Sequence, residues 1–571
     1  MIFRIIMGIP SYFGWLVRHF EKRIISQHLP VNEIHNIYFD LNCGIHPIAR
    51  SHPEYTIDQM CDNVVIYLDY LIKYVNPKEL IYVAIDGVAP VAKMKQQRHR
   101  RFKSAKESME INQIKKKYRV DYEPNQTDFN MISPATHFMA VLSLKINDYL
   151  KKLSLCKIKI IYSDSSVPSE GEHKIMQHIK TQPLDKSCVI YGLDSDLIML
   201  SMCANRSNIM LIRGNTLLKG NEVDIVIDKF PQLNYFIIDE LKYIIYNILK
   251  NTSMHVSDLG EDFMFDIAIE NDMELIIRDY VFMSFLLGND FVPSFTTLKI
   301  RENGIEKIID GYHTIRRSCE GSCNDHFIND NLLINVPFLS KLINLLSTDE
   351  DHDFKQIDYK HNKRGYTNTP NVPHNEESEI DQYQKVEYLW DNYIDPNKHC
   401  WEKRYYEYFF HIKPEMYNIK TICSEYMKGL QWIATYYFDK CHDWYWYYPY
   451  EATPLLIDLK QHINLHESSP DIDNDPLPPY FQLFMILPPH SLSLLPKPYH
   501  SYMISDHSPF KQYFPDDFKL EFYGKRYRWE AHPRIPLINP YELEYHLGHV
   551  YSLLSQEEQE RGKIRDIITY N

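Results

Sequence analysis

The stretch KIKIIYSDSSVPSEGEHKIMQHI, Lys157 to Ile179, contains an apolar strand pattern, a polar turn and the start of an amphipathic helix. The segments IHNIYFDLN, ELIYVAIDG and SCVIYGLDSD likewise place an apolar run of about five residues before a polar turn. Short buried strands that alternate with helical patterns are typical of an α/β fold. We therefore predict a mainly parallel central sheet flanked by helices.

Each of these strand patterns ends at an aspartate, and the four are Asp40, Asp86, Asp164 and Asp194. A single aspartate at this position commonly forms a turn or caps a helix. Ligand sites of open parallel sheets lie beyond the carboxyl ends of the strands. Four such aspartates in series therefore indicate one shared crevice.

Further carboxylates follow the same strands. Asp196 stands two residues after Asp194, and Glu170 and Glu172 open the helical pattern GEHKIMQHI, where helix capping is an alternative role. Asp290 follows the apolar helix pattern that Gly288 and Asn289 end. The predicted cluster holds seven acids: Asp40, Asp86, Glu170, Glu172, Asp194, Asp196 and Asp290.

Seven carboxylates in one crevice would repel one another unless cations neutralised them. Oxygen ligands suit Mg²⁺, with Mn²⁺ as a substitute, and the number of acids suits two ions. Two ions roughly 4 Å apart stabilise the attacking and leaving oxygens of a displacement at phosphorus. Metal-dependent phosphodiester hydrolysis is the expected chemistry.

A basic segment runs from Lys93 to Arg119. It holds eleven Lys or Arg and two Glu, a local balance of +9 in a chain whose net charge is -14. On a helix, Lys93, Gln97, Arg100 and Arg101 share one face, whereas Lys95 and Arg98 point elsewhere. This face could grip a terminal phosphate of a polyanion, with a solvated basic helix as the alternative.

Composition excludes several classes of protein. No apolar run approaches the roughly 20 residues of a membrane span, and the N-terminal residues lack a signal-peptide pattern, so we expect neither an anchor nor export. No phosphate-cradling GxxxxGK pattern occurs. The ten cysteines are scattered, and Cys319, Cys323 and His326 lack the second pair that a zinc site would need. We expect reduced thiols.

Three regions follow from the pattern. Residues 1–346 form the predicted nuclease domain, and residues 385–571 form a second region rich in Trp, Tyr and Pro that completes the site. Residues 347–384 are polar throughout and have little apolar surface to repay the entropy of ordering. We predict a polar linker or disordered loop there.

Long motifs along the chain resemble the Xrn family of 5′-to-3′ exoribonucleases. These motifs are MGIPSYFGWL, YFDLNCGIHP, AIDGVAPVAKMKQQRHRRF, PSEGEHKI, YGLDSDLIML and FLLGNDFVP, followed in the second region by YMKGLQWIATYYFDKCHDWYWYYPY, LPPHSLSLLPKPY and FKLEFYGKRYRWEAHPRIPLINPYEL. The resemblance covers nearly the whole chain outside residues 347–384. It implies a nuclease core of the PIN or 5′-nuclease type.

The resemblance also implies roles for individual residues. The seven acids match the family's metal-binding acids, and Lys93, Gln97, Arg100 and Arg101 match its pocket for a 5′-monophosphate. His46 matches the histidine that stacks on the terminal base, opposite either Trp444 or Trp446. Pro90 stands where the family admits single strands and excludes duplex. The implied activity is processive degradation of single-stranded, 5′-monophosphorylated RNA to nucleoside 5′-monophosphates.

Some features depart from the family pattern. Six residues precede the expected start at Met7, and Glu451 follows YYPY where the family tends to have histidine, which changes the charge near the aromatic cluster. The chain ends soon after the second conserved region, so we expect no additional C-terminal domains. We further expect a monomer that acts inside the cell, in the cytoplasm rather than the nucleus, or in the cytoplasm of a host if the protein is viral.

Two other functions stay open. A structure-specific 5′ flap DNA nuclease would share the acidic core, but it would normally follow the core with a helix-hairpin-helix element, and no glycine-centred hairpin follows Asp290. A non-catalytic binder of RNA 5′ ends would keep the acids and lose the geometry. Metal-dependent degradation separates these possibilities.

Overall fold

We describe a computed structural model of the chain. It describes residues 9, 11–125, 127–156, 158–192, 194–214, 232–251, 272–318, 325–367, 372–386, 393–413, 415–463 and 472–571. Met7, Gly8 and Pro10 of the first motif, and the Cys319 and Cys323 pair, lie outside these residues. In the described part of the chain, no helix combines the length and the hydropathy needed to cross a bilayer.

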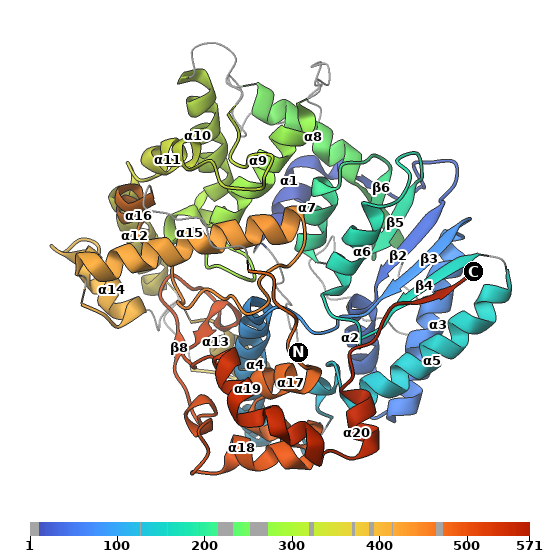
Figure 1. The fold of residues 1–571 in the computed structure, drawn as a ribbon. Helices are drawn as coiled ribbons and strands as arrows, with labels where there is room; N and C mark the ends of the chain where they lie inside the picture. The colour runs from blue at the N-terminus through green and yellow to red at the C-terminus, as the bar shows by residue number, and fades with distance from the viewer. Residues whose placement is uncertain are drawn as a thin grey trace.

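An eight-stranded sheet forms the framework of the N-terminal region (Figure 1). Its order is β1 (Ile25–Ser26), β7 (Leu233–Ile237), β6 (Ile209–Gly214), β5 (Cys188–Tyr191), β2 (Asn36–Asp40), β3 (Leu80–Ala84), β4 (Lys159–Ser163) and β10 (Ile568–Tyr570). The pairs from β6 through β5, β2 and β3 to β4 are parallel, and the outer pairs are antiparallel. The four predicted strands are therefore adjacent and parallel, and the predicted α/β fold is confirmed.

Helices cover both faces of the sheet because its strands are apolar on both sides. On one face lie α2 (Asn42–Ser51), α3 (Ile57–Val75) and α5 (His137–Leu153), packed on alternate strand residues such as Ile37, Phe39 and Val83. On the other face lie α1 (Tyr12–Ile24), α6 (Gly171–Ile179), α7 (Ser195–Cys203) and α8 (Ile238–Lys250), packed on residues such as Tyr38 and Tyr82.

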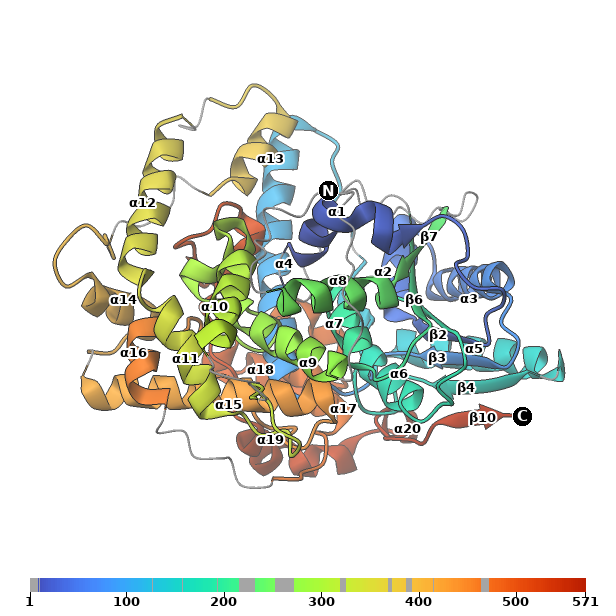
Figure 2. The same ribbon diagram turned by 90° about the horizontal axis from the view of Figure 1, so that it is seen from above.

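The hydrophobic core on the second face of the sheet, which contains α1, α6, α7 and α8, continues into the later part of the chain. It includes α9 (Met273–Ser284), α10 (Gly304–Ser318), α11 (Val336–Leu346), α15 (Met416–Phe438) and α16 (Leu456–His462). The last strand, β10, pairs with β4 and runs along the sheet edge in Figure 2. The two predicted regions thus share one core and one sheet, and the boundary between them stays a prediction.

The long helix α4 (Val91–Tyr118) stands between these halves (Figure 2). Its first turns pack on α17 (Pro479–Ile486) within a third core that also holds residues of α18 (His500–Ile504) and α19 (Pro540–Leu547). The remaining named elements are α14 (Trp401–Phe410), α20 (Gln556–Arg561) and the pair β8 (Leu520–Glu521) and β9 (His532–Pro533).

The prediction of a polar linker or disordered loop at residues 347–384 is wrong for the residues described. They form α12 (Glu350–Thr367) and α13 (Glu376–Gln384). Phe354 of α12 packs on Trp401, and the Glu350 carboxylate accepts backbone hydrogen bonds at the start of α16. Lys117 and Arg119 of α4 pair with Glu379 and Glu376 of α13. Long-range polar contacts therefore order a segment whose apolar content is low.

Candidate active site

The carboxyl ends of the parallel strands bring the predicted acids together. Asp40 is the last residue of β2, and Asp86 follows β3 by two residues. The Asn42 side chain donates to Asp86 Oδ2 at 2.8 Å, and its Oδ1 accepts from the Asp86 backbone N–H at 3.2 Å. The amide of Asn42 therefore fixes the Asp86 carboxylate at the edge of the sheet.

Gly171, at the start of α6, lies against these two aspartates. Its backbone N–H donates to Asp86 Oδ1 at 2.7 Å, and a Cβ added to it would lie 2.8 Å from Asp40 Oδ1. Glu170 is the N-cap residue of α6, but its side chain makes no capping hydrogen bond. The capping alternative thus does not account for Glu170, whose carboxylate faces the cluster.

Lys93 of α4 connects two of the acids. Its Nζ lies 2.5 Å from Glu170 Oε2 and 2.8 Å from Asp290 Oδ2. Tyr436 of α15 donates its hydroxyl hydrogen to Glu170 Oε1 at 2.8 Å. Helices from both halves of the chain therefore reach the cluster. Tyr436 lies in one of the family-like motifs but is not among the predicted site residues.

Asp290 depends on a tight turn. The positive φ of Gly288, 83°, and the close approach of its backbone to Ser294 require a glycine there. The Asn289 side chain then accepts from the backbone N–H groups of Phe291 and Val292. This turn ends the apolar segment after α9, as predicted from Gly288 and Asn289, and Asp290 lies 2.8 Å from Lys93 Nζ.

The cluster is short of positive charge. Asp40 Oδ1, Glu172 Oε2 and Asp196 Oδ1 are buried and have no hydrogen-bond partner within the described residues. Burial raises the pKa of Asp40, and the negative charge of Asp86 raises it further. Burial likewise raises the pKa of Glu172, and the negative charge of Asp196 adds to this effect. Burial also raises the pKa of Asp194 to about 6. Buried carboxylate oxygens without partners are costly.

These residues fit bound cations. The predicted acids supply oxygen ligands from several strands and helices, which is the donor set that Mg²⁺ and Mn²⁺ prefer. Ligand atoms of Asp40, Cys43 and Asp194 lie within 4.8 Å of one another, and so do those of Glu170, Glu172 and His173. The seven predicted acids form a connected cluster, whereas Asp164 binds Ser143 and Ser166 and serves the turn.

The predicted basic face of α4 is divided between two tasks. Lys93 lies among the acids, while Arg101 donates to Ser133 Oγ at 2.7 Å and keeps its buried Nη1 without a partner. Burial and the neighbouring Arg100 lower the pKa of Arg101 to about 9. This surplus of buried positive charge is suited to an anion. The helix rise places Gln97 about 6 Å and Arg101 about 12 Å beyond Lys93.

His46 lies close to this basic group. Burial lowers its pKa, and the charges of Arg50, Arg100 and Arg101 lower it further. Its Nδ1 is buried without a hydrogen-bond partner in the described chain. A neutral imidazole near these three guanidinium groups can stack on a base without adding charge.

The two candidate tryptophans lie beside the start of α4. The Trp444 carbonyl accepts from the Val91 backbone N–H at 2.8 Å, directly after Pro90, the N-cap residue. Trp446 stacks on Trp432 with ring centroids 5.0 Å apart. Both tryptophans are half-buried, and neither can be chosen as the base-stacking residue from these contacts.

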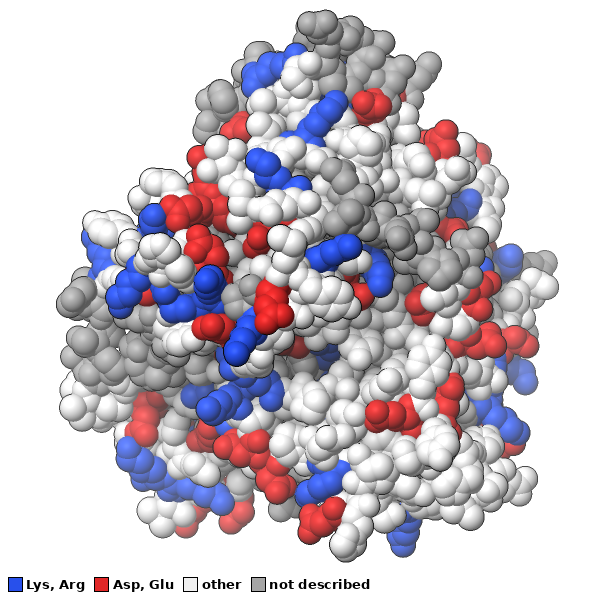
Figure 3. Space-filling view, turned by 60° about the vertical axis from the view of Figure 1, so that its left-hand side comes forward, with Lys and Arg blue, Asp and Glu red and all other residues white. Residues whose placement is uncertain are grey.

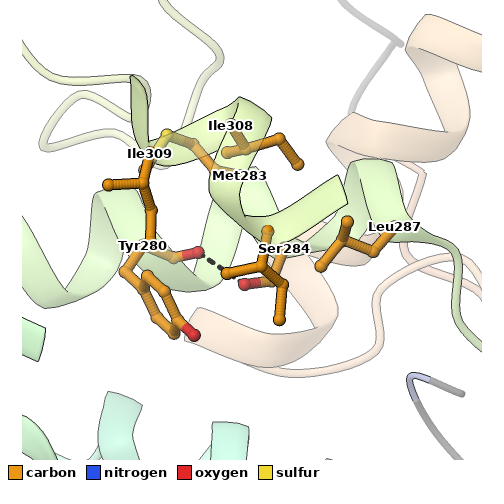
Figure 4. Close-up of a pocket in the computed structure, with 7 residues that line it drawn as sticks. Tyr280, Met283, Ser284, Leu287, Ile308 and Ile309 are labelled. Atoms are coloured by element: carbon orange, nitrogen blue, oxygen red, sulfur yellow. Dashed lines mark hydrogen bonds between the residues drawn. The ribbon is translucent and has the colours of Figure 1, made fainter. Parts of the chain in front are cut away.

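One pocket among the described residues lacks this chemistry. The pocket in Figure 4 is lined by Tyr280, Met283, Ser284, Leu287, Ile305, Ile308 and Ile309, none of which is charged. On the face shown in Figure 3, basic and acidic side chains alternate in small groups. The carboxylate cluster and the adjoining face of α4 are therefore the best candidate site.

Two family models cover most of the sequence. The model described as XRN 5′-3′ exonuclease N-terminus matches residues 7–215, and the model described as Xrn1 helical domain matches residues 270–395 and 374–570. The chain belongs to the XRN exonuclease family. Six of the seven acids lie in the first match, and Asp290 lies in the second.

Curated relatives agree with this assignment. The chain is 29% identical to human 5′-3′ exoribonuclease 1 over 98% of its own length and 35% of the relative's. It is 28% identical to 5′-3′ exoribonuclease 2 of Arabidopsis thaliana over 97% of its length and 68% of the relative's. The chain is 28% identical to the 5′-3′ exoribonuclease 2 homolog of Drosophila melanogaster over 99% of its own length and 73% of the relative's. The chain thus spans about a third of the human relative and about seven tenths of the other two.

Proposed function

We propose that this XRN family member is a processive 5′-to-3′ exoribonuclease that degrades single-stranded, 5′-monophosphorylated RNA to nucleoside 5′-monophosphates. We further propose that two divalent cations, Mg²⁺ or Mn²⁺, bind to the seven acids. The proposal rests mainly on one observation: buried carboxylates with unpartnered oxygens surround Lys93, at the start of the helix that carries Arg100 and Arg101.

Bound to these acids, divalent cations would lower the pKa of water and stabilise the charge that develops at phosphorus. The residues of the chain position them and the substrate. Asn42 and the Gly171 N–H orient Asp86, while Lys93 and Tyr436 orient Glu170. Lys93 also supplies a fixed positive charge, and it can stabilise charge on a phosphate that lies beside the acids.

The basic face of α4 supports the proposed preference for a 5′-monophosphate. Nη1 of Arg101 is an unpartnered buried donor, and a terminal phosphate would supply both the acceptor and the negative charge. His46, next to Arg100 and Arg101, would lie against the terminal base, with Trp444 or Trp446 on the other side. Stacking of this kind contributes about 1 to 3 kcal/mol per base.

The test compares one RNA sequence with a 5′-monophosphate, a 5′-triphosphate or a 5′-hydroxyl in the presence of Mg²⁺, with products resolved by length. We expect rapid conversion of the monophosphate form alone to mononucleotides. Persistence of all three RNAs while they still bind would favour an end-binding protein. Internal cuts regardless of the 5′ group would refute the role of the α4 face and favour an endonuclease.

Two variants sharpen this assay. Asp196→Asn should abolish hydrolysis and preserve RNA binding, because Asp196 has a buried oxygen without a partner in the described cluster. Asp164→Asn is the matched control, since Asp164 also follows a central strand but binds Ser143 and Ser166 instead. Equal activity of both variants would contradict the proposed cluster.

A further inference from the structure

A second group of metal-binding side chains lies outside the carboxylate cluster. It consists of His99 of α4, Glu451, which follows the aromatic segment 444–450, and His532 of β9. One ligand atom from each residue lies within 4.8 Å of the other two. The three residues come from segments far apart in the sequence, so only the tertiary fold brings them together.

The Glu451 carboxylate is divided between two neighbours. Its Oε1 lies 2.9 Å from Lys95 Nζ, and its Oε2 lies 3.6 Å from His99 Nδ1. The second distance is too long for a good hydrogen bond, but it is close to the spacing of two ligands on one metal ion. The pKa of Glu451 lies below its ordinary value, because the effects of Lys95 and His99 exceed the opposing effect of burial.

The two ring nitrogens of His99 have different surroundings: Nδ1 faces Glu451 at 3.6 Å, and Nε2 is the nitrogen without a partner. The residue is 8% exposed, and its Nε2 is buried with no hydrogen-bond partner in the described part of the chain. A buried polar nitrogen without a partner is energetically unfavourable. Burial lowers the pKa of both His99 and His532.

Basic side chains surround this group and oppose a dication. Lys95, Lys103 and Lys525 all lower the pKa of His532, and Arg98 acts on His99 in the same way. Several of these charges are already bound elsewhere. Lys95 donates to the carbonyls of Tyr448 and Tyr450, Lys103 to those of Trp529 and Ala531, and Arg98 to those of Pro536 and Met485.

We propose that His99, Glu451 and His532 form a binding site for Zn²⁺ that is separate from the carboxylate cluster. Two imidazoles and one carboxylate are a donor set of zinc sites, whereas Mg²⁺ requires more oxygen ligands. The site connects α4 to Glu451, directly after the aromatic segment 444–450, and to β9. Zn²⁺ there would fix the helix that carries Gln97 and Arg101. The inference does not depend on the proposed nuclease activity.

Cobalt substitution tests the proposal on the full chain. The protein is stripped with a chelator and titrated with Co²⁺ in excess Mg²⁺, which occupies the carboxylate cluster. Co²⁺ with four ligands gives an intense visible band, whereas six-coordinate Co²⁺ on oxygen ligands absorbs weakly. We expect one such band that saturates at one Co²⁺ per chain and that Zn²⁺ displaces.

Variants assign the band to the site. His99→Ala, His532→Ala and Glu451→Gln should each weaken Co²⁺ binding at least tenfold. His442→Ala is the matched control, because His442 lies between Asp439 and Asp473 at 2.9 and 3.6 Å but lacks a second histidine. Glu451→Gln preserves an oxygen for Lys95, and circular dichroism confirms that each variant is folded. Absence of the band in the wild type, or its survival in folded His99→Ala and His532→Ala proteins, would overturn the proposal.

Discussion

Replacing Gly171 with alanine tests the geometry of the proposed active site with the smallest addition. The new Cβ would lie 2.8 Å from Asp40 Oδ1 and 3.3 Å from Asp86 Oδ1. Ordinary contacts begin near 3.4 Å, so the Asp40 carboxylate must move by about 0.6 Å. A misplacement of about 1 Å at a catalytic group costs about 10²-fold in rate. We therefore expect Gly171→Ala to lower kcat by about 10- to 100-fold.

The same substitution should not destabilise the fold. Alanine is favoured over glycine in helices by up to about 1 kcal/mol, and the atoms that it meets are carboxylate oxygens that can move. The assay is single-turnover degradation of 5′-monophosphorylated RNA, together with thermal unfolding and RNA binding in Ca²⁺. Gly14→Ala is the control, because Gly14 lies in the first turn of α1 with nothing within 4 Å of an added Cβ. Activity of Gly171→Ala within twofold of the wild type would refute the reasoning.

Three further predictions test separate parts of the molecule. Tyr436→Phe removes the hydroxyl that donates a hydrogen bond to Glu170. Because hydrogen bonds to charged groups contribute about 1.5 to 3 kcal/mol, we expect kcat to fall by about 10- to 100-fold. RNA affinity in a filter-binding assay should stay unchanged. Arg101→Ala should reduce the ratio of monophosphate to hydroxyl RNA degradation at least tenfold, and an unchanged ratio would count against the phosphate pocket. Burial lowers the pKa of His178 to about 4, so between pH 6.5 and 4 the unfolded state binds more protons and the unfolding free energy falls as the pH falls. His178→Gln should reduce this fall by about 1 to 2 kcal/mol in urea titrations, after allowance for the partial exposure of the ring, and equal slopes would show that His178 does not contribute.

Much of the fold could be predicted because its signals are local. The strands before Asp40, Asp86, Asp164 and Asp194 are short apolar runs, and such runs are buried on both faces of a parallel sheet. Their shared direction then places the aspartates at one edge. The rule does not distinguish Asp164, which binds Ser143 and Ser166, because the choice depends on what lies next to each turn.

Residues that act over long distances in the sequence could not be predicted. Tyr436 reaches Glu170 across 266 residues, and although it lies in a family-like motif, no local pattern assigns it to the acids. The low apolar content of residues 347–384 predicts a polar linker or disordered loop, whereas the described residues form α12 and α13. Phe354 of α12 packs on Trp401, and ion pairs join α13 to the C-terminal end of α4. The composition of the segment does not indicate these contacts with distant residues. Gly171, in contrast, could have been found, because a glycine between two clustered acids indicates restricted space.

The basic segment shows why charge content and charge function differ. The balance of +9 between Lys93 and Arg119 indicates a polyanion partner, yet several of its cations serve the fold. Arg98 is fully buried and donates to backbone carbonyls of the second region, and Lys95 does the same at Tyr448 and Tyr450. Helical periodicity separated these two residues from Lys93 and Arg101 because opposite faces of α4 meet different partners. One helix thereby joins the two halves of the chain and presents its other face to the acids, so a shift of α4 would alter the fold and the proposed phosphate pocket together.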